Sequence, residues 1–479
     1  MKGFDVVIVC TSTQNKADFW KNRLNSSELI KNKTKVYSVF EKWDGGAGQL
    51  LGTLNALEEV KKLTDLDEMI KNGCSVAIYH TAGKGKRIAP LSLAEIDKGA
   101  VRLPRLVEYS SKKEPITLLE AVIDQTSIFA ETRKGRISVF WGDGLYIPSE
   151  DVFCEGKYHV ELFGIRGEAP AKEKDWKTGW ESYGLIIPKE GGSIQREKQS
   201  WEDFKGLVKK GVIKPSQSGK IILGRSIGCF SISYEFFKAL LKEYETELSE
   251  KTEKLDTDPH LWMPLTSSKE DFEDKKLWDR VNRFKENFVE NDTSNLALFG
   301  DKDLGKKTYW WDFGQLFLYH SNLLRLLEET EEGDKLRGLF KLETSFIRYE
   351  KSRNLKVKNS ILLDSKVRGK VENCIVVGAI ARSLNAKNSV IINSKMNVCK
   401  ANKSVIYNCI DPNKLILNGE TVVDLFHPEF GGIRMKTSQN RDGKKDWNKK
   451  ICSNRYTYAE IESMKGGQKP KDPPSDRLK

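Results

Sequence analysis

A repeat between residues 354 and 411 constrains the fold of this chain more than any other feature. Its units are KNSIL, ENCIV, KNSVI and NKSVI, and their apolar positions Ile361, Ile375, Val390 and Val405 lie 14 or 15 residues apart. Short β-branched runs separated by Asn, Ser and Gly are typical of stacked β-solenoid coils, with aliphatic side chains inside and Asn at tight bends. We predict a β-solenoid (β-helix) over residues 351–420, with a plain antiparallel sheet as the alternative.

Before the repeat, short apolar runs rich in β-branched residues alternate with amphipathic stretches. The predicted strands are VVIVC (6–10), VAIYH (76–80) and ISVFWGD (137–143), and the predicted helices span 118–131, 236–255 and 315–340. Such alternation favours a Rossmann-like α/β fold with a mixed, mainly parallel sheet, whose ligands bind at the carboxyl ends of the strands. We expect an α/β domain over 1–350, the solenoid, and a C-terminal extension over 421–479 that ends in disorder.

Composition excludes several classes of protein. No run of about 18 apolar residues occurs, so we expect no contact with a membrane. The eight cysteines are scattered singly, which predicts reduced thiols in a cytoplasmic protein rather than a zinc site or a disulfide framework. A net charge of +12 suits an anionic partner, but the lysines are spread along the chain. We therefore expect no nucleic-acid partner, and interpret the basic stretch at 441–450 as a solvated surface.

The segment HTAGKGKRIAPL, residues 80–91, follows a predicted strand and contains two closely spaced glycines. Such glycines let the backbone approach a phosphate, and successive N–H groups can point at the anion. Arg87 would add a forked cation where negative charge accumulates. Glycine turns are also common after strands that bind nothing, so this motif alone leaves both interpretations open.

This loop resembles the signature of the sugar nucleotidyltransferases, Gly-Gly-x-Gly-x-Arg-x-x-Pro-Leu, with alanine at the first glycine and Lys86 in place of a small hydroxyl residue. The resemblance implies that three loop residues bind a nucleotide: Ala82, Gly83 and Gly85. It also implies that Arg87 and Lys98 contact phosphates, because that family carries a lysine soon after the loop.

Further elements follow in the order that this family shows. Asp143 ends ISVFWGD, and Asp312 lies in WDFG, which resembles the Trp-x-Asp-x-Gly element; both are implied ligands of Mg²⁺. Two carboxylates from distant strands suit Mg²⁺, which typically takes one or two of them together with phosphate oxygens. Glu197 and Lys198 resemble the pair that holds the sugar and its phosphate, and Gly228 lies in the segment that resembles the next sugar-contacting strand.

An early element, GGAGQLLGTLNAL, contains Gly46 and Gly48 and precedes the signature loop. A similar GGA-x-x-TL-x-AL element is found in the fucose-1-phosphate guanylyltransferase family, which also ends in a β-helical region. The likeness implies that both glycines contact the nucleotide. The DKG at residues 97–99 is similar to the Pro-Lys-Gly of UDP-sugar pyrophosphorylases, so uridylyl transfer stays open.

These resemblances imply an Mg²⁺-dependent enzyme of the sugar-1-phosphate nucleotidyltransferase (nucleotide-diphospho-sugar transferase) type. It would join a nucleoside triphosphate to a sugar-1-phosphate, with GDP-fucose as a candidate product. The alternatives are UDP-sugar synthesis, a non-catalytic sensor of nucleotide sugars, and an acyltransferase on the solenoid with His427 as its base. The solenoid itself is interpreted as a packing or homo-oligomerisation module.

Overall fold

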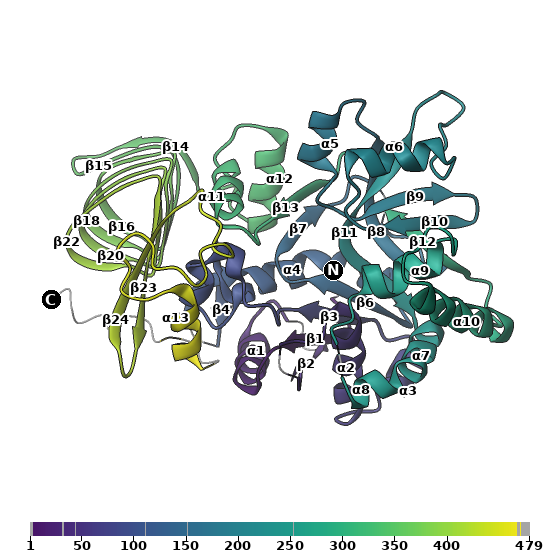
Figure 1. The fold of residues 1–479 in the computed structure, drawn as a ribbon. Coiled ribbons are helices and arrows are strands. Elements are labelled where there is room, and N and C mark those ends of the chain that lie inside the picture. Colours follow the sequence, from purple (N-terminus) through teal and green to yellow (C-terminus); the bar gives the residue numbers. More distant parts are fainter. Residues whose placement is uncertain are drawn as a thin grey trace.

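The computed structural model shows an α/β part joined to a stack of short strands (Figure 1). It describes residues 3–30, 33–43, 45–110, 112–150, 152–251, 253–466 and 470. Within the described residues, the main sheet contains nine strands, and the stack of strands begins after residue 345. The predicted α/β architecture with large, mainly parallel sheets is confirmed.

The amino-terminal half of the main sheet is parallel, with the spatial order β2, β1, β3, β6. The bounds of these strands are β1 Val6–Thr11, β2 Lys35–Phe40, β3 Val76–His80 and β6 Arg136–Trp141. Alternate residues of β1 enter two separate apolar cores, with Val7 and Val9 in one and Val6 and Ile8 in the other. The sheet is therefore covered on both faces, as the unbroken apolar sequence of β1 requires.

The other half of the sheet is mixed. Strand β11 pairs antiparallel with β6, β8 and β9, whereas β12 lies parallel to β8 and β10 antiparallel to β9. The bounds are β8 Tyr158–Glu168, β9 Leu185–Lys189, β10 Gly192–Arg196, β11 Ile222–Ser233 and β12 Ala297–Asp303. Two small ribbons complete the α/β part, and their strands are β4 Arg102–Tyr109, β5 Lys112–Thr117, β7 Gly144–Ile147 and β13 Tyr309–Asp312.

Helices fill the connections between the strands. They are α1 Gln14–Ser26, α2 Gln49–Lys61, α3 Leu66–Lys71, α4 Leu118–Thr126, α5 Glu173–Gly179, α6 Trp201–Lys209, α7 Tyr234–Glu243, α8 Glu245–Ser249, α9 Met263–Thr266, α10 Lys275–Asn291, α11 Leu316–Arg325, α12 Glu331–Phe340 and α13 Tyr458–Lys465. Each of the three predicted helical regions contains helix, with that at 236–255 divided between α7 and α8 and that at 315–340 between α11 and α12. Helix α4 covers 118–126 and continues as a 3₁₀ segment, and the predicted helix at 236–255 ends at Ser249. No described helix is long and apolar enough to cross a membrane.

The repeat region forms two parallel ladders that share β15. One ladder joins β15, β17, β19, β21 and β23, and the other joins β15, β16, β18, β20 and β22. The bounds are β14 Phe346–Lys351, β15 Leu355–Leu363, β16 Lys366–Glu372, β17 Ile375–Val377, β18 Ile380–Lys387, β19 Val390–Ile392, β20 Lys395–Asn402, β21 Val405–Tyr407, β22 Ile410–Asn418, β23 Glu420–His427 and β24 Gly431–Ser438. Only the described end strands β14 and β24 pair antiparallel, so the antiparallel alternative is wrong for the interior of the ladders.

Positions one repeat apart are direct partners in this stack. Ile361 pairs with Ile375, Ile375 with Val390, and Val390 with Val405, and all four side chains are fully buried. Several asparagines adopt the left-handed backbone conformation at the bends, among them Asn359, Asn373, Asn388, Asn393 and Asn408. Their amides also bond to each other between neighbouring repeats, at 2.8 Å from Asn359 to Asn373 and 2.9 Å from Asn393 to Asn408. The predicted use of Asn at tight bends is confirmed.

The stack and the α/β part share one apolar core. The hydroxyl of Tyr407 donates to Glu95 Oε1 at 2.7 Å and accepts the backbone N–H of Arg102 at 2.9 Å. The hydroxyl of Tyr319 donates to the carbonyl of Arg102 at 2.7 Å. These buried hydrogen bonds fix the ladders to the segment that follows the glycine loop.

The C-terminal extension contains β24 and α13 inside its expected bounds, and β23 begins one residue before them at Glu420. Lys444, Lys445, Lys449 and Lys450 are exposed, and the interpretation of this basic stretch as solvated surface stays a prediction. The expected disorder at the end of the chain concerns residues 467–469 and 471–479, which lie outside the described residues.

Candidate active site

The glycine-rich loop follows β3 directly and turns through short 3₁₀ segments rather than entering a long helix. Gly83 and Arg87 are exposed on it, and Ala82 is half-buried. Gly85 has φ +61°, and a Cβ atom there would lie 2.7 Å from the Cβ of Lys98. Glycine is needed at this position because the loop packs against Lys98 and because its backbone is left-handed.

Lys98 begins the last of these 3₁₀ turns, which Asp97 caps by accepting the N–H of Ala100. Its Nζ atom lies 2.7 Å from Oδ2 of Asp143 in the turn after β6, and both side chains are largely buried. The structure thus brings together two predicted site residues that are 45 positions apart. The ammonium group of Lys98 sits where it would neutralise one carboxylate of a metal pair.

Asp143 and Asp312 lie side by side because β7 and β13 pair directly behind them. Asp312 is the register partner of Gly144, and the N–H of Phe313 donates to the Asp143 carbonyl at 2.9 Å. A Cβ atom on Gly314 would lie 3.0 Å from Oδ2 of Asp143 and from Oδ1 of Asp312 alike. The two carboxylates therefore converge on one position.

Acidic and basic side chains meet around this position. Burial raises the pKa of Asp312, and the negative charge of Asp143 raises it further. Arg87 reaches the same place, since its Nη2 atom lies 3.6 Å from the position that a Cβ atom of Gly314 would take. Two carboxylates with an all-oxygen donor set fit Mg²⁺, and the nearby cations suit phosphate groups.

The early glycine loop, residues 45–48, packs against protein rather than standing open. Gly46 and Gly48 both have φ +83°, and a Cβ atom on Gly48 would lie 2.5 Å from the carbonyl oxygen of Leu255. The N–H of Ala47 donates to Oε2 of Glu41 at 2.8 Å. Close backbone packing therefore accounts for Gly48 without any ligand.

Gln49 connects this early loop to the predicted sugar-contacting strand, because its Nε2 donates to the carbonyl of Gly228 at 3.4 Å. Gly228 occupies an irregular register position of β11 with φ +75°, and a Cβ atom there would lie 2.4 Å from the indole nitrogen of Trp141. Position 228 must therefore be glycine, because a larger residue would collide with Trp141, which precedes the Gly142–Asp143 turn.

Glu197 and Lys198 form an ion pair of 3.1 Å just beyond β10, with Lys198 largely exposed and in the left-handed region at φ +45°. Beside them lies Asp258, whose pKa rises to about 7 because it is buried and faces Glu197. Oδ1 of Asp258 accepts Nε2 of Gln195 at 3.0 Å. Among the described residues, no hydrogen bond or ion pair joins Glu197 or Lys198 to Asp143 or Asp312.

Tyr183 and Gly184 link the two groups of residues. The pKa of Tyr183 is raised by burial and then by Asp312, so this phenol lies near the acid pair. A Cβ atom on the adjacent Gly184 would lie 3.1 Å from Oε2 of Glu197. Sequence reasoning missed Tyr183, Gln195 and Asp258, since none of them belongs to a motif of recognisable spacing.

The C-terminal extension packs against the outer side of the glycine loop. A Cβ atom on Gly443 would lie 2.2 Å from the carbonyl oxygen of Lys86, and the Lys86 ammonium lies over the ring of Trp447 at 5.1 Å. Lys465 of α13 is buried and donates to the carbonyl of Ser92 at 3.2 Å. This contact explains why α13 lies beside the α/β part in Figure 1.

His427 is engaged on both ring nitrogens. Its Nε2 atom lies 3.0 Å from the carbonyl oxygen of Met464, and its Nδ1 atom accepts the N–H of Glu429 at 3.2 Å. Because Nδ1 is an acceptor, Nε2 carries the proton and donates to Met464. A histidine held in this way is poorly placed to act as the base of an acyltransferase.

Comparison with family models gives no match, and comparison with curated proteins gives none either. A similar solved structure is that of the inositol-1-phosphate CTP transferase from T. maritima. It has 13% sequence identity and a TM-score of 0.23, over 71% of this chain and 98% of that one. So low a score carries no inference about this chain, and the function must be argued from the site.

Proposed function

We propose that this chain transfers a nucleotidyl group from a nucleoside triphosphate to a sugar-1-phosphate, releasing pyrophosphate and forming a nucleotide sugar. The observation that carries the proposal is the convergence of Asp143 and Asp312 on one position, with Arg87 and Lys98 beside them. Paired carboxylates next to an arginine and a lysine are what phosphate transfer with Mg²⁺ requires.

In the proposed reaction, an oxygen of the sugar phosphate attacks the α-phosphorus of the triphosphate in line. A new P–O bond forms as the bond from the α-phosphorus to the bridging oxygen breaks, and pyrophosphate carries away the electron pair. The attacking oxygen is already ionised at neutral pH, so the site needs no general base. Catalysis then consists of alignment and charge neutralisation.

The chain's own residues divide these tasks. Asp143 and Asp312 would hold Mg²⁺, which when bound offsets the charge of the phosphate oxygens. The exposed guanidinium of Arg87 would receive the triphosphate over Gly83 and Gly85. Lys98 would turn from Asp143 to a phosphate oxygen as the metal takes its place.

The sugar would lie between the acid pair and Glu197. Tyr183 supports this position, because it lies near Asp312 while its neighbour Gly184 packs against Glu197. Glu197 and Lys198 would hold the hydroxyls and the phosphate of the sugar, with Asp258 behind Glu197. In the early loop, Gly46 would lie against the nucleotide, whereas Gly48 packs against Leu255.

A screen of pyrophosphate release with each nucleoside triphosphate against a panel of sugar-1-phosphates tests the reaction. GTP with fucose-1-phosphate is the first pair to test, and UTP pairs are the second. Pyrophosphate release without metal, or from no pair in the presence of Mg²⁺, contradicts the proposal. Nucleotide-sugar binding without turnover would instead identify a sensor.

Asp143→Asn and Asp312→Asn test the metal assignment. Each is expected to lower the rate of pyrophosphate release by about 10²-fold or more, as removal of a preorganised electrostatic group does elsewhere. Asp279→Asn on exposed α10 is the matched control, since its only described ion pair is with Lys269 at the surface. Near-normal rates in both site variants would show that the metal lies elsewhere.

We further propose that the ladders form a β-helix that mediates homo-oligomerisation in the cytoplasm. The parallel register and the buried repeat positions support the β-helix. Strand β22 is an open edge carrying Ile416, which is 59% exposed, and open edges favour strand addition. None of the eight cysteines forms a disulfide in the described structure, which fits a reducing compartment. Light scattering of the full chain and of Ile416→Lys measures the oligomeric state; a monomer in both contradicts the role.

A further inference from the structure

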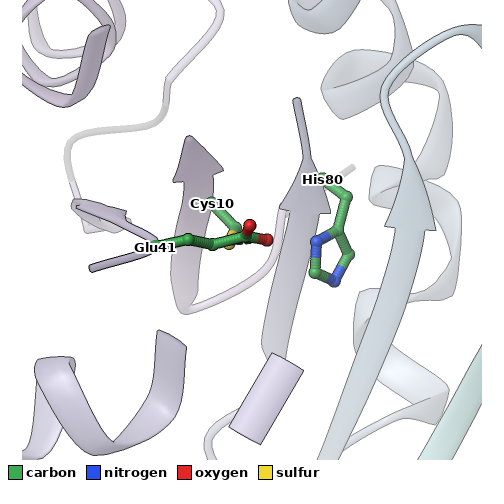
Figure 2. Close-up of side chains that lie close together, drawn as sticks. All are labelled: Cys10, Glu41 and His80. Carbon is green, nitrogen blue, oxygen red and sulfur yellow. Dashed lines mark hydrogen bonds between the residues drawn. The ribbon is translucent and has the colours of Figure 1, made fainter. Parts of the chain in front are cut away.

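Three potential metal ligands meet beneath the two glycine loops, apart from the acid pair. They are Cys10 in β1, Glu41 just after β2 and His80 at the end of β3 (Figure 2). Cys10 and His80 are register partners on adjacent strands, which places their side chains next to each other. The ligand atoms of the three groups all lie within 4.8 Å of one another, and all three residues are buried.

Each of these side chains is oriented by a further contact. His80 Nε2 lies 2.9 Å from Oγ1 of Thr53, and Glu41 Oε2 accepts the N–H of Ala47, which leaves Oε1 toward the Cys10 sulfur at 3.9 Å. When Nε2 donates to Thr53, the lone pair on Nδ1 of His80 is left to bind a metal. Outer hydrogen bonds of this kind fix the ligands of metal sites.

Gly52 supplies an independent observation. It lies inside α2, where glycine is less favourable than alanine. A Cβ atom there would lie 2.8 Å from Oε1 of Glu41 and 3.3 Å from Cε1 of His80. The missing side chain lets Glu41 and His80 pack closely against α2, at a place where the helix would otherwise favour alanine.

A divalent cation would be compensated by the charges of this cluster. One thiolate and one carboxylate balance the two charges of the ion and leave the site neutral.

We propose that Cys10, Glu41 and His80 bind a zinc ion. Sulfur and imidazole donors favour Zn²⁺, whereas the all-oxygen pair Asp143 and Asp312 favours Mg²⁺. The donor atoms of the two sites therefore predict a different metal in each. The ion would pin together the carboxyl ends of β1, β2 and β3. It would thereby hold both glycine loops, because Glu41 bonds to Ala47 and the signature loop begins directly after His80.

From the sequence alone we predicted no zinc site, since no pair of cysteines is closely spaced. The three ligands lie on three different strands, at positions 10, 41 and 80. Only the parallel order of β2, β1 and β3 brings them to one edge. Spacing in the sequence therefore gave no signal for this site.

Metal content and cobalt spectra of the full-length protein test the proposal without using its activity. We expect about one zinc per chain by mass spectrometry of the metal, and a thiolate-to-cobalt charge-transfer band when Co²⁺ replaces it. Cys10→Ser and His80→Gln should lose both signals, and Gly52→Ala should weaken zinc binding about 10- to 100-fold. Cys374→Ser, which removes a buried thiol in the ladders, should keep both.

If a variant fails to fold, a second measurement on the wild-type protein still tests the proposal. In mild denaturant, zinc should slow the alkylation of Cys10 compared with protein treated with a chelator, measured at each cysteine by mass spectrometry, and should leave the exposed Cys154 and Cys452 equally reactive. Wild-type protein with no cobalt band and no protection of Cys10 overturns the proposal. Because no readout involves a nucleotide, this result is separate from any failure of the proposed transferase reaction.

Discussion

At the residue scale, Lys98 competes with the metal that the acid pair is proposed to bind. Its ammonium lies 2.7 Å from Asp143 and therefore acts as the local counter-ion of this carboxylate. A divalent ion must displace it, and the freed ammonium can then neutralise a phosphate. The same residue would thus weaken metal binding alone and strengthen binding of metal together with triphosphate.

Lys98→Met is accordingly expected to have two opposite effects. The maximal rate of pyrophosphate release should fall by about 10²-fold, because a cation is lost from the phosphates. The Mg²⁺ concentration for half-maximal rate should also fall, because Asp143 loses its competitor. Lys98→Arg, which keeps the charge, should retain the wild-type Mg²⁺ dependence. A Met variant that needs as much Mg²⁺ as wild type would refute this competition.

Asp258 gives a prediction for stability against pH. Burial and Glu197 raise its pKa to about 7 from an ordinary value of 3.8, so the folded protein keeps a proton that the unfolded chain has lost in this window. Wild-type stability therefore falls as pH rises from about 4 to about 7 and levels off above that. Asp258→Asn removes this loss, so its melting temperature relative to wild type should be higher at pH 8 than at pH 5.

Thermal unfolding at the two pH values measures this difference. Glu202→Gln is the control, since Glu202 is exposed on α6 and pairs only with the neighbouring Lys205 in the described structure. An equal offset between Asp258→Asn and wild type at both pH values would mean that Asp258 titrates normally.

At the element scale, helix α13 supports the glycine loop through a chain of polar contacts. Lys465 donates to the Ser92 carbonyl at 3.2 Å, and the Ser92 hydroxyl donates to the carbonyl of Gly85 at 3.0 Å. Glu462 lies near both Lys465 and Lys16, at 3.2 and 3.8 Å. The side chains of Lys465, Lys16 and Glu462 are all largely buried. A small number of specific polar contacts therefore holds α13 against the α/β part.

Lys465→Met should therefore loosen the loop without touching the proposed substrates. We expect it to lower the free energy of unfolding by about 1–3 kcal/mol, because a buried acceptor loses its donor. Hydrogen exchange at residues 83–93 should become faster. Lys449→Met at the surface should change neither quantity. Unchanged exchange in the Lys465 variant would show that α13 does not support the loop.

The sequence predicted structural elements best where a residue pattern determines the local backbone geometry. The ladder register followed from the repeat because Ile361 and Ile375 must face one interior, and Asp143 was found because acids after buried strands meet at one sheet edge. Asp258 and Glu41 had no such signal, since each gains its partners only through the fold. The 3₁₀ turns after Gly85 were also missed, because the loop is shaped by contacts with Lys98 and α13.

At the scale of the whole molecule, the ladders and the α/β part are not independent. One apolar core contains Leu103 and Tyr319 together with Ile375, Val390 and Tyr407 of the ladders. The buried hydroxyl of Tyr407 bonds to the segment that begins a few residues after Lys98. Loss of the ladders would therefore expose apolar surface next to the proposed active site.

A fragment of residues 1–350 tests this dependence, because the sequence alone predicts it to be a separate domain. We expect the fragment to be aggregated or partly unfolded, and the full chain to unfold in one cooperative transition. Circular dichroism, calorimetry and pyrophosphate release from the fragment and the full chain provide the comparison. Tyr407→Phe in the full chain should lower the unfolding free energy by about 1–3 kcal/mol, because Glu95 and Arg102 lose a buried partner. A stable, active fragment would show instead that the ladders serve only assembly.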